Sequence, residues 1–337
     1  MTTEIGIVGA SYYLPPRRKT VTDIFRDERI PAERLAANVD FQRDIGIEAV
    51  HLASDETATS LALNACRKVL DKTGIDPAEI DLIIDFTSIP EEYVAPTWSA
   101  AGIVQREIGA TNAFATAVNT GGCASYHTTL KVAGSLLATN ERYRTALLFA
   151  GDKVPEFNHT YYPITVICDG GSAVILRKGH APRQILSVEV STLGRLHDVW
   201  FVPGFHRRDP ADKDRKWLHM TADIPKFNKE VIPMNLFMFR KVMREALSRA
   251  GRKQQEISYY VYPTFSTWDQ KAFCEAFMLP PEKVFTDGLR RHGHLQETDM
   301  VLDYVDAMDE GYIKEGDLVM LTTNGAGFSW GAALIQH

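Results

Sequence analysis

The sequence has few cysteines and no long apolar run. Only four cysteines occur in 337 residues, and none shows the C-x-x-C or histidine-paired spacing of a zinc or redox site. No apolar stretch approaches the ~18 residues that a membrane-spanning helix requires, and no low-complexity tract divides the chain. These features argue against a metal centre, a disulfide scaffold and a membrane span, and they predict reduced thiols in a cytoplasmic protein.

An excess of positive charge is also lacking. The formal net charge is −6, which argues against nucleic acid or an anionic membrane as the main partner. The start of the chain, MTTEIGIVGASYYLPP, has no basic n-region, so no signal peptide is predicted. The length suits about two domains or two fused halves.

Expected strands and helices alternate along the chain. In the first part, strands are predicted at 4–12, 80–88, 113–118, 145–152 and 170–176, and helices at 57–73, 96–108 and 124–138. In the second part, strands are predicted at 185–193 and 257–265, helices at 233–251, 268–279 and 303–313, and a hairpin at 317–335. This alternation is typical of an α/β fold with a largely parallel sheet.

Two similar segments indicate that the fold is duplicated. GGSAVIL at 170–176 and GFSWGAALI at 327–335 each lead from a glycine-rich turn into a strand of small residues. They predict two α/β halves, residues 1–178 and 179–337. The stretch 194–232, which contains Trp200, is too long for an ordinary connection and is expected to cover a pocket.

The chain is organised around Cys123. It follows a short apolar run, which predicts a buried strand, and an Asn-Thr-Gly-Gly turn, and it opens a helix. This arrangement resembles a nucleophile elbow. The positive end of a helix dipole favours the thiolate, which is the nucleophilic form. The alternative is a small core residue, which is the interpretation given to Cys66, Cys168 and Cys274.

Four segments together resemble the thiolase superfamily and, within it, the ketoacyl synthase III family. They are the Cys123 elbow, IDLIIDFTSIPEEYVAPTWSAAGIVQREIGA, DGGSAVIL and NGAGFSWGAALI. The resemblance implies a thiolase-like five-layered αβαβα fold, a homodimer and acyl transfer through a cysteine thioester. It also implies an acyl carrier protein (ACP) or coenzyme A thioester as the acyl donor and no tightly bound cofactor.

The chain departs from that family at two positions. Thr264 follows Pro263 where a histidine is expected, and His294 follows Gly293 where an asparagine is expected. In the family, the histidine and asparagine donate hydrogen bonds to the enolate formed in decarboxylative condensation. A threonine hydroxyl is a single neutral donor, so that pair is compromised here.

A cysteine with one histidine remains suited to acyl transfer, since imidazole can take a proton from an attacking hydroxyl or amine. The orienting acid is Asp299 or, alternatively, Glu297. The Gly-His-x-x-x-x-Asp pattern resembles the branch of the family that forms esters or amides, often in polyketide tailoring. This resemblance favours a triad of Cys123, His294 and Asp299, while the alternatives are a surface histidine and a solvated helix aspartate.

The resemblance also implies the rest of the pocket. The backbone N–H groups of Cys123 and Gly327 are expected to form the oxyanion hole, and Gly327 is also readily explained as a turn residue. Ala95 and Thr264 are expected to line the acyl pocket, and a small Ala95 predicts room for an acyl group bulkier than acetyl. His197 is an alternative base, and His127 is expected to be a packed histidine.

The acyl donor is less directly indicated. The family's tryptophan and arginine on the adenine of coenzyme A fall near Asp40 and Asp44, with Phe41 and Arg43 one residue away, which favours a carrier protein as donor. A basic helix face is either a docking surface for an acidic carrier protein or a solvated surface. Its members are Arg240, Lys241, Arg244, Arg249, Arg252 and Lys253.

Three functions therefore remain open. The favoured one is an acyltransferase that moves an acyl group from Cys123 to a hydroxyl or amine acceptor. The second is a ketoacyl synthase III that condenses with malonyl-ACP, against which the missing histidine argues. The third is a non-catalytic subunit of a synthase, against which the intact Cys123 elbow argues.

Overall fold

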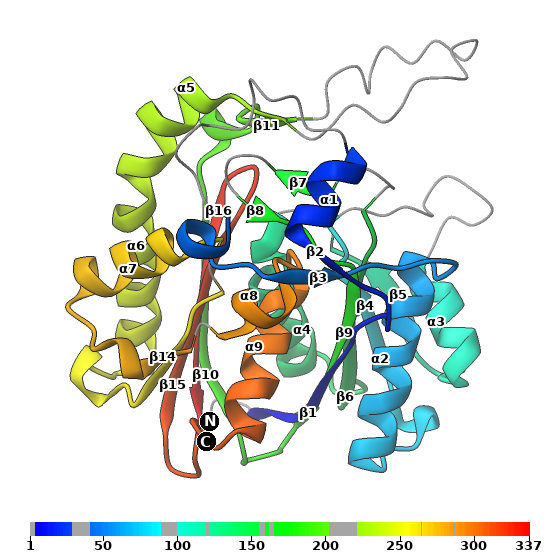
Figure 1. Cartoon of the computed structure of the whole chain (residues 1–337). Helices are drawn as coiled ribbons and strands as arrows, with labels where there is room; N and C mark the ends of the chain where they lie inside the picture. The colour runs from blue at the N-terminus through cyan, green and yellow to red at the C-terminus, as the bar shows by residue number, and fades with distance from the viewer. Residues whose placement is uncertain are drawn as a thin grey trace.

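The computed structural model describes residues 4–28, 41–88, 100–118, 122–154, 159–161, 165–201, 221–263, 265–285 and 287–337. Ten of its strands form one sheet in the order β14-β13-β15-β16-β10-β1-β9-β6-β4-β5 (Figure 1). Five strands come from the first part of the chain: β1 (Ile5–Tyr13), β4 (Leu82–Asp85), β5 (Phe114–Ala117), β6 (Thr145–Asp152) and β9 (Gly170–Lys178). The other five are β10 (Gln184–Thr192), β13 (Tyr259–Val261), β14 (Val284–Phe285), β15 (Leu318–Gly325) and β16 (Ser329–Gln336).

The two sets of five strands have the same topology. The order β1-β9-β6-β4-β5 in the first set corresponds to β10-β16-β15-β13-β14 in the second. In each set the first three strands are antiparallel and the last two are parallel to the third. A short antiparallel pairing of Gly6 with Gln184 joins the sets.

The α/β fold is as predicted, but the expectation of a largely parallel sheet is wrong. The sheet is mixed, because β15 and β16 are joined by a tight turn that permits only antiparallel pairing. The corresponding strands β6 and β9 are antiparallel as well. Strand–helix alternation in the sequence therefore indicated the class and not the strand directions.

Helices separate and cover the two halves of the sheet. Helices α4 (Ser125–Thr139) and α9 (Thr298–Asp309) contact strands of both sets. Helices α2 (Ala58–Thr73) and α3 (Ala100–Ile108) cover the outer face of the first set, and α6 (Ile232–Ala250) and α7 (Thr267–Phe277) that of the second (Figure 1). One apolar core fills the central layer and two fill the outer layers. The arrangement is the five-layered αβαβα architecture.

Helix α2 illustrates how local sequence sets an element. The Thr57 side chain accepts a hydrogen bond from the Ser60 N–H, and the Ser60 side chain accepts one from the Thr57 N–H, which satisfies two free N–H groups at the helix start. Gly74 ends the helix at a φ of 66°. The predicted limits of this helix therefore agree with the observed ones to within one residue.

Strand β5, which leads toward Cys123, is less buried than its sequence suggested. It lies at the edge of the sheet and pairs with β4, and Phe114 is 53% exposed. The prediction of a buried strand here is wrong because an apolar run does not reveal whether a second strand or a helix covers it.

Smaller elements lie outside the ten-stranded sheet. They are β2 (Arg18–Thr20), β3 (Ala49–His51), α1 (Val21–Glu28), β7 (Thr160–Tyr161), β8 (Thr165–Val166) and α8 (Asp287–His292). Within the expected pocket-covering stretch, β11 (Trp200–Phe201) pairs with β12 (Thr221–Ala222). Throughout the described part of the chain, every helix is too short or too polar to cross a bilayer.

Candidate active site

Cys123 lies in a short 3-10 turn, Gly122–Ala124, that runs directly into α4. Gly122 has a φ of +53°, and a Cβ atom there would lie 2.6 Å from the Ala326 nitrogen and 2.9 Å from the Ala326 oxygen. Only glycine permits this conformation and approach together. Gly122 therefore holds the Cys123 turn directly against the turn between β15 and β16. The preceding residues 119–121 lie outside the described part of the chain.

We expect Gly122→Ala to destabilise the protein by about 1–3 kcal/mol, because the new Cβ adds backbone strain and a contact with the Ala326 backbone. The matched control is Gly134→Ala in α4, where a Cβ meets no atom within 4 Å. Alanine is the better helix former there, so this variant should be neutral or more stable. Chemical denaturation measures both, and equal stability of the two variants would contradict the close approach.

His294 is fixed by its backbone. Its N–H donates to the Val166 carbonyl at 3.1 Å, and its carbonyl accepts from the Cys168 N–H at 2.8 Å. Gly293 precedes it at a φ of +82°, and a Cβ there would lie 2.3 Å from Val50 Cγ1. The Phe265 ring packs edge-on against the imidazole, with 4.8 Å between the ring centroids. These contacts leave the buried imidazole one defined position.

Cys123, His294 and Asp299 lie in one hydrogen-bonded row. Cys123 Sγ is 3.7 Å from His294 Nε2, and His294 Nδ1 contacts Asp299 Oδ2. The other carboxylate oxygen, Asp299 Oδ1, accepts from the Leu295 N–H at 2.6 Å. The side chains of His294 and Asp299 are both buried. Two halves of the chain thus contribute to one site, with the thiol from the first and the imidazole and carboxylate from the second.

The hydrogen bonds define the histidine tautomer. Asp299 accepts a backbone N–H, so it acts as the acceptor of the pair and His294 Nδ1–H as the donor. The lone pair is then on Nε2, which faces the Cys123 thiol. This is the arrangement in which a histidine can take a proton from a thiol, an alcohol or an amine.

The surroundings of Cys123 oppose the thiolate that the helix start is expected to favour. Burial raises the pKa of the thiol well above its usual value, and the nearby carboxyls of Glu297, Asp299 and Asp152 raise it further. A backbone hydrogen bond lowers the pKa, but it is the smallest of these contributions. The thiol therefore rests in the protonated form and needs a base to become a nucleophile.

Glu297, the alternative orienting acid, does not contact His294 through any described hydrogen bond. Its Oε1 accepts from the Ser88 N–H, and its carboxyl lies within hydrogen-bonding reach of that of Asp152 at the end of β6. Burial raises the pKa of Glu297 to about 7. Asp299 is thus the acid in contact with the imidazole.

Sequence reasoning missed three residues around the site, namely Asp152, Ser88 and Phe265. A signal was available for Asp152, since an acidic residue that ends a fully buried strand, TALLFAGD, requires a partner. Ser88 acts through its backbone and Phe265 through its shape, and neither has a sequence signal of its own.

The other candidate histidines lie away from the thiol. The side chain of His197 is 76% exposed, and its Nδ1 contacts the Gly194 carbonyl at 3.1 Å, so it is not placed as a base for Cys123. His127 is fully buried against Gly331, with Nε2 3.0 Å from the Leu321 carbonyl. Burial lowers the His127 pKa to about 4, as expected of a packed neutral histidine. The described residues contain no cluster of three or more side chains suited to a metal ion.

Gly327 lies in the turn between β15 and β16, next to the Ala326 backbone that meets Gly122. Its φ is +120°, and a Cβ there would meet no atom within 4 Å. The two residues expected in the acyl pocket, Ala95 and Thr264, lie outside the described residues. Their roles stay predictions.

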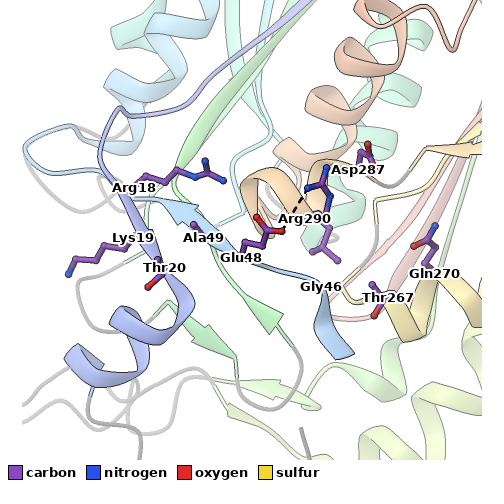
Figure 2. Close-up of a pocket in the computed structure, with 11 residues that line it drawn as sticks. Arg18, Lys19, Thr20, Gly46, Glu48, Ala49, Thr267, Gln270, Asp287 and Arg290 are labelled. Carbon is purple, nitrogen blue, oxygen red and sulfur yellow. Dashed lines mark ion pairs between the residues drawn. The ribbon is translucent and has the colours of Figure 1, made fainter. Parts of the chain in front are cut away.

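A separate pocket of about 620 Å³ opens on the surface (Figure 2). Its lining residues are Arg18, Lys19, Thr20, Gly46, Glu48, Ala49, Thr267, Gln270, Asp287, Leu289 and Arg290. Figure 2 shows Arg290 directed toward Glu48, with an ion-pair distance of 3.8 Å. Leu289 also packs in an apolar cluster with Val50 and Leu295, the residue after His294. Cys123, His294 and Asp299 are not among the residues that line this pocket.

The positions expected to contact coenzyme A are partly described. Asp40 lies outside the described residues, as does the side chain of Phe41. Asp44 is buried, and its carboxylate accepts hydrogen bonds from Arg43 at 2.7 and 2.8 Å. Arg43 is thus engaged by its neighbour.

The basic face of α6 and the following turn is largely engaged within the chain. Four of its six cations contact neighbouring groups: Arg240 the Ala276 carbonyl, Lys241 Ser191, Arg249 Glu189 and Arg252 Glu256. These contacts favour a solvated, internally paired surface over a carrier-docking patch.

Two family models match the chain on either side of its midpoint. The model described as 3-oxoacyl-ACP synthase III matches residues 118–194, which include Cys123. The model described as the C-terminal part of the same enzyme matches residues 247–337, which include His294 and Asp299.

Individual relatives match nearly the whole chain. β-Ketoacyl-ACP synthase III from Clostridium perfringens is 27% identical over 339 residues, covering 98% of this chain and 98% of the relative. The crystal structure of 3-oxoacyl-ACP synthase III from Aquifex aeolicus has a TM-score of 0.81 at 23% identity, over 99% of this chain and 100% of that one. The structure of ChlB3, described as an acyltransferase, has a TM-score of 0.82 at 20% identity, over 99% of this chain and 97% of that one. The chain is therefore a thiolase-superfamily protein of the ketoacyl-ACP synthase III-like type, which comprises acyl-transferring and condensing enzymes.

Proposed function

We propose that this protein is an acyltransferase that forms an ester or amide through an acyl thioester on Cys123. The observation that carries the proposal is the row of Cys123, His294 and Asp299, in which a buried carboxylate directs the free lone pair of the imidazole at the thiol. Such an imidazole is a general base. In this family an asparagine, which donates hydrogen bonds and cannot act as a base, is expected at this position.

The first half-reaction acylates the enzyme. The Cys123 thiol gives its proton to His294 Nε2 as Sγ attacks the carbonyl carbon of the donor thioester. The carbon–sulfur bond to the donor then breaks, and the departing thiolate takes the proton from Nε2. Backbone N–H groups at Cys123 and Gly327 would stabilise the negative oxygen of the intermediate.

The second half-reaction releases the acyl group. His294 Nε2 takes the proton of an acceptor hydroxyl or amine as that oxygen or nitrogen attacks the acyl-Cys123 carbonyl. The bond to Sγ breaks, and the thiolate recovers its proton from His294. Asp299 keeps Nδ1 protonated and stabilises the imidazolium formed in each half-reaction. No carbon dioxide is released in this sequence.

The donor is proposed to be an acyl-ACP or an acyl-coenzyme A, in keeping with the synthases that the chain resembles. The engaged Arg43 offers no free cation in place of the arginine expected for coenzyme A, which favours a carrier protein. A homodimer is also proposed, because β5 ends the sheet and exposes Phe114. The acyl group, the acceptor and a role in secondary metabolism belong to the same proposal.

Intact-protein mass spectrometry tests the reaction class. The protein is mixed with a panel of acyl thioesters, malonyl thioester included, and then with hydroxyl or amine acceptors. We expect an acyl adduct on Cys123 that is absent in Cys123→Ala and is discharged onto an acceptor without release of carbon dioxide. Discharge only with malonyl-ACP and with release of carbon dioxide would instead identify a condensing enzyme. If none of the acyl thioesters in the panel forms an adduct on Cys123, the result would contradict both acyl transfer and condensation.

A further inference from the structure

Two carboxyl groups that the proposed reaction does not use meet beneath the site. Asp152, the last residue of β6, and Glu297, three residues after His294, are both fully buried. Their carboxyls lie within hydrogen-bonding reach of each other. One oxygen of each is otherwise engaged: Glu297 Oε1 accepts from the Ser88 N–H, and Asp152 Oδ2 accepts from Thr298 Oγ1 at 3.3 Å.

The remaining oxygens, Asp152 Oδ1 and Glu297 Oε2, are buried and have no donor from another residue. Two ionised carboxylates in contact repel each other, and burial removes the water that would screen them. A proton between these two oxygens removes the conflict. Glu297 already accepts a backbone N–H, so it is the better acceptor, and Asp152 is the carboxyl that carries the proton.

Other charges around the pair act in the same direction. The charge of Asp85 acts on Asp152, and the Cys123 thiol is close enough to Glu297 and Asp152 to interact with them electrostatically. Burial and the Glu297 carboxyl raise the pKa of Asp152 well above its usual value. The one histidine in the cluster, His294, has its proton committed to Asp299. The pair therefore retains at least one proton at neutral pH.

We infer that Asp152 and Glu297 share one buried proton and act as positioning residues. The shared proton joins Glu297, and with it the segment that carries His294, to Asp152 on β6. It also leaves the pair with one negative charge near the Cys123 thiol instead of two. The effect on turnover rests on the proposed function. The proton itself and the state of the thiol can be measured without any acyl donor.

Infrared spectroscopy detects the proton directly through the C=O stretching band of a protonated carboxyl. In Asp152→Asn and in Glu297→Gln, the amide N–H takes over the donor role and the remaining carboxyl ionises. We expect each single variant to lose one carboxyl's intensity from this band at pH 7. Glu315→Gln, at an exposed position, should leave the band unchanged. Unchanged intensity in both single variants would overturn the shared proton.

Alkylation of Cys123 by iodoacetamide, mapped by mass spectrometry, measures the thiol. Cys123 is the partly exposed cysteine, and the other three are buried. The double variant Asp152→Asn/Glu297→Gln removes the pair's charge and keeps its shape, so the alkylation rate at pH 8 should rise about tenfold. A rate equal to that of Glu315→Gln would overturn the link to the thiol. A changed rate without acyl adducts would support this inference and count against the proposed function.

The pH dependence of stability gives a third readout. The folded-state pKa is raised for both carboxyls, so the folded protein binds more protons than the unfolded chain above their ordinary values of 3.8 and 4.5. Their contribution to stability is therefore greatest at acid pH and is lost as the pH rises through about 7 for Glu297. In the double variant we expect the free energy of unfolding to fall less over this pH range. If the free energy of unfolding falls with pH as steeply as in the wild type, the result would count against a shared proton.

Discussion

Replacing His294 by alanine should lower the rate of acyl transfer by about 10²- to 10⁴-fold, the usual contribution of a general base. The loss should be large because the thiol rests in the protonated form and its described hydrogen-bond partner is His294 Nε2. Both half-reactions use this proton acceptor, so adduct formation and adduct discharge should slow together. Stopped-flow quenching followed by intact-protein mass spectrometry measures the two steps separately.

The matched control for that variant is His197→Ala. Its histidine is exposed and contacts the Gly194 carbonyl, so we expect rates within a factor of about two of the wild type. Comparable losses in the two variants would mean that His294 has no special role. Circular dichroism should show both variants folded, which separates a loss of chemistry from a loss of structure.

Changing Asp299 to asparagine should lower the acylation rate by about 10²-fold or more, because the substitution should change the tautomer of His294. The Leu295 N–H requires an oxygen, so the asparagine would keep its Oδ1 there and direct its Nδ2–H₂ group at His294 Nδ1. Nδ1 would then have to accept, the ring proton would move to Nε2, and Nε2 would lose the lone pair that faces Cys123. The acylation rate, measured from adduct formation, is the readout.

Asp309→Asn is the control for this second variant, since Asp309 lies at the exposed end of the same helix, α9. It should acylate at the wild-type rate. A further distinction comes from nitrogen NMR of ¹⁵N-histidine protein, in which the His294 tautomer should differ between Asp299→Asn and the control. An unchanged tautomer in Asp299→Asn would contradict the explanation even if the rate fell.

The sequence was most informative where local rules operate. The helix predicted at 57–73 agrees with α2, which the structure caps at Thr57 and ends at Gly74, and the alternation of strands and helices indicated the α/β class. The resemblance to a known family supplied the five layers and the selection of Cys123, His294 and Asp299. The five-residue spacing of His294 and Asp299 is also short enough for one turn of chain to bring them together.

The rest depended on contacts between distant parts of the chain. Asp152 meets Glu297 only because β6 and the segment before α9 pack together, and no local pattern specifies that meeting. The raised pKa of the Cys123 thiol follows from that same packing, which buries the thiol beside carboxyl groups. The exposure of β5 likewise depends on which strands and helices surround it, not on its own residues.

Because the site is divided between the two halves of the chain, its geometry depends on how those halves are aligned. Cys123 belongs to the half that contains β6, and His294 belongs to the half that contains β15, while α4 and α9 are wedged between them. A relative slip of about 1 Å would open the 3.7 Å contact of Sγ and Nε2 beyond hydrogen-bonding reach. Neither half is expected to retain a reactive centre alone. Replacing one half by that of a relative should therefore preserve activity only if the new half keeps the same alignment with the other.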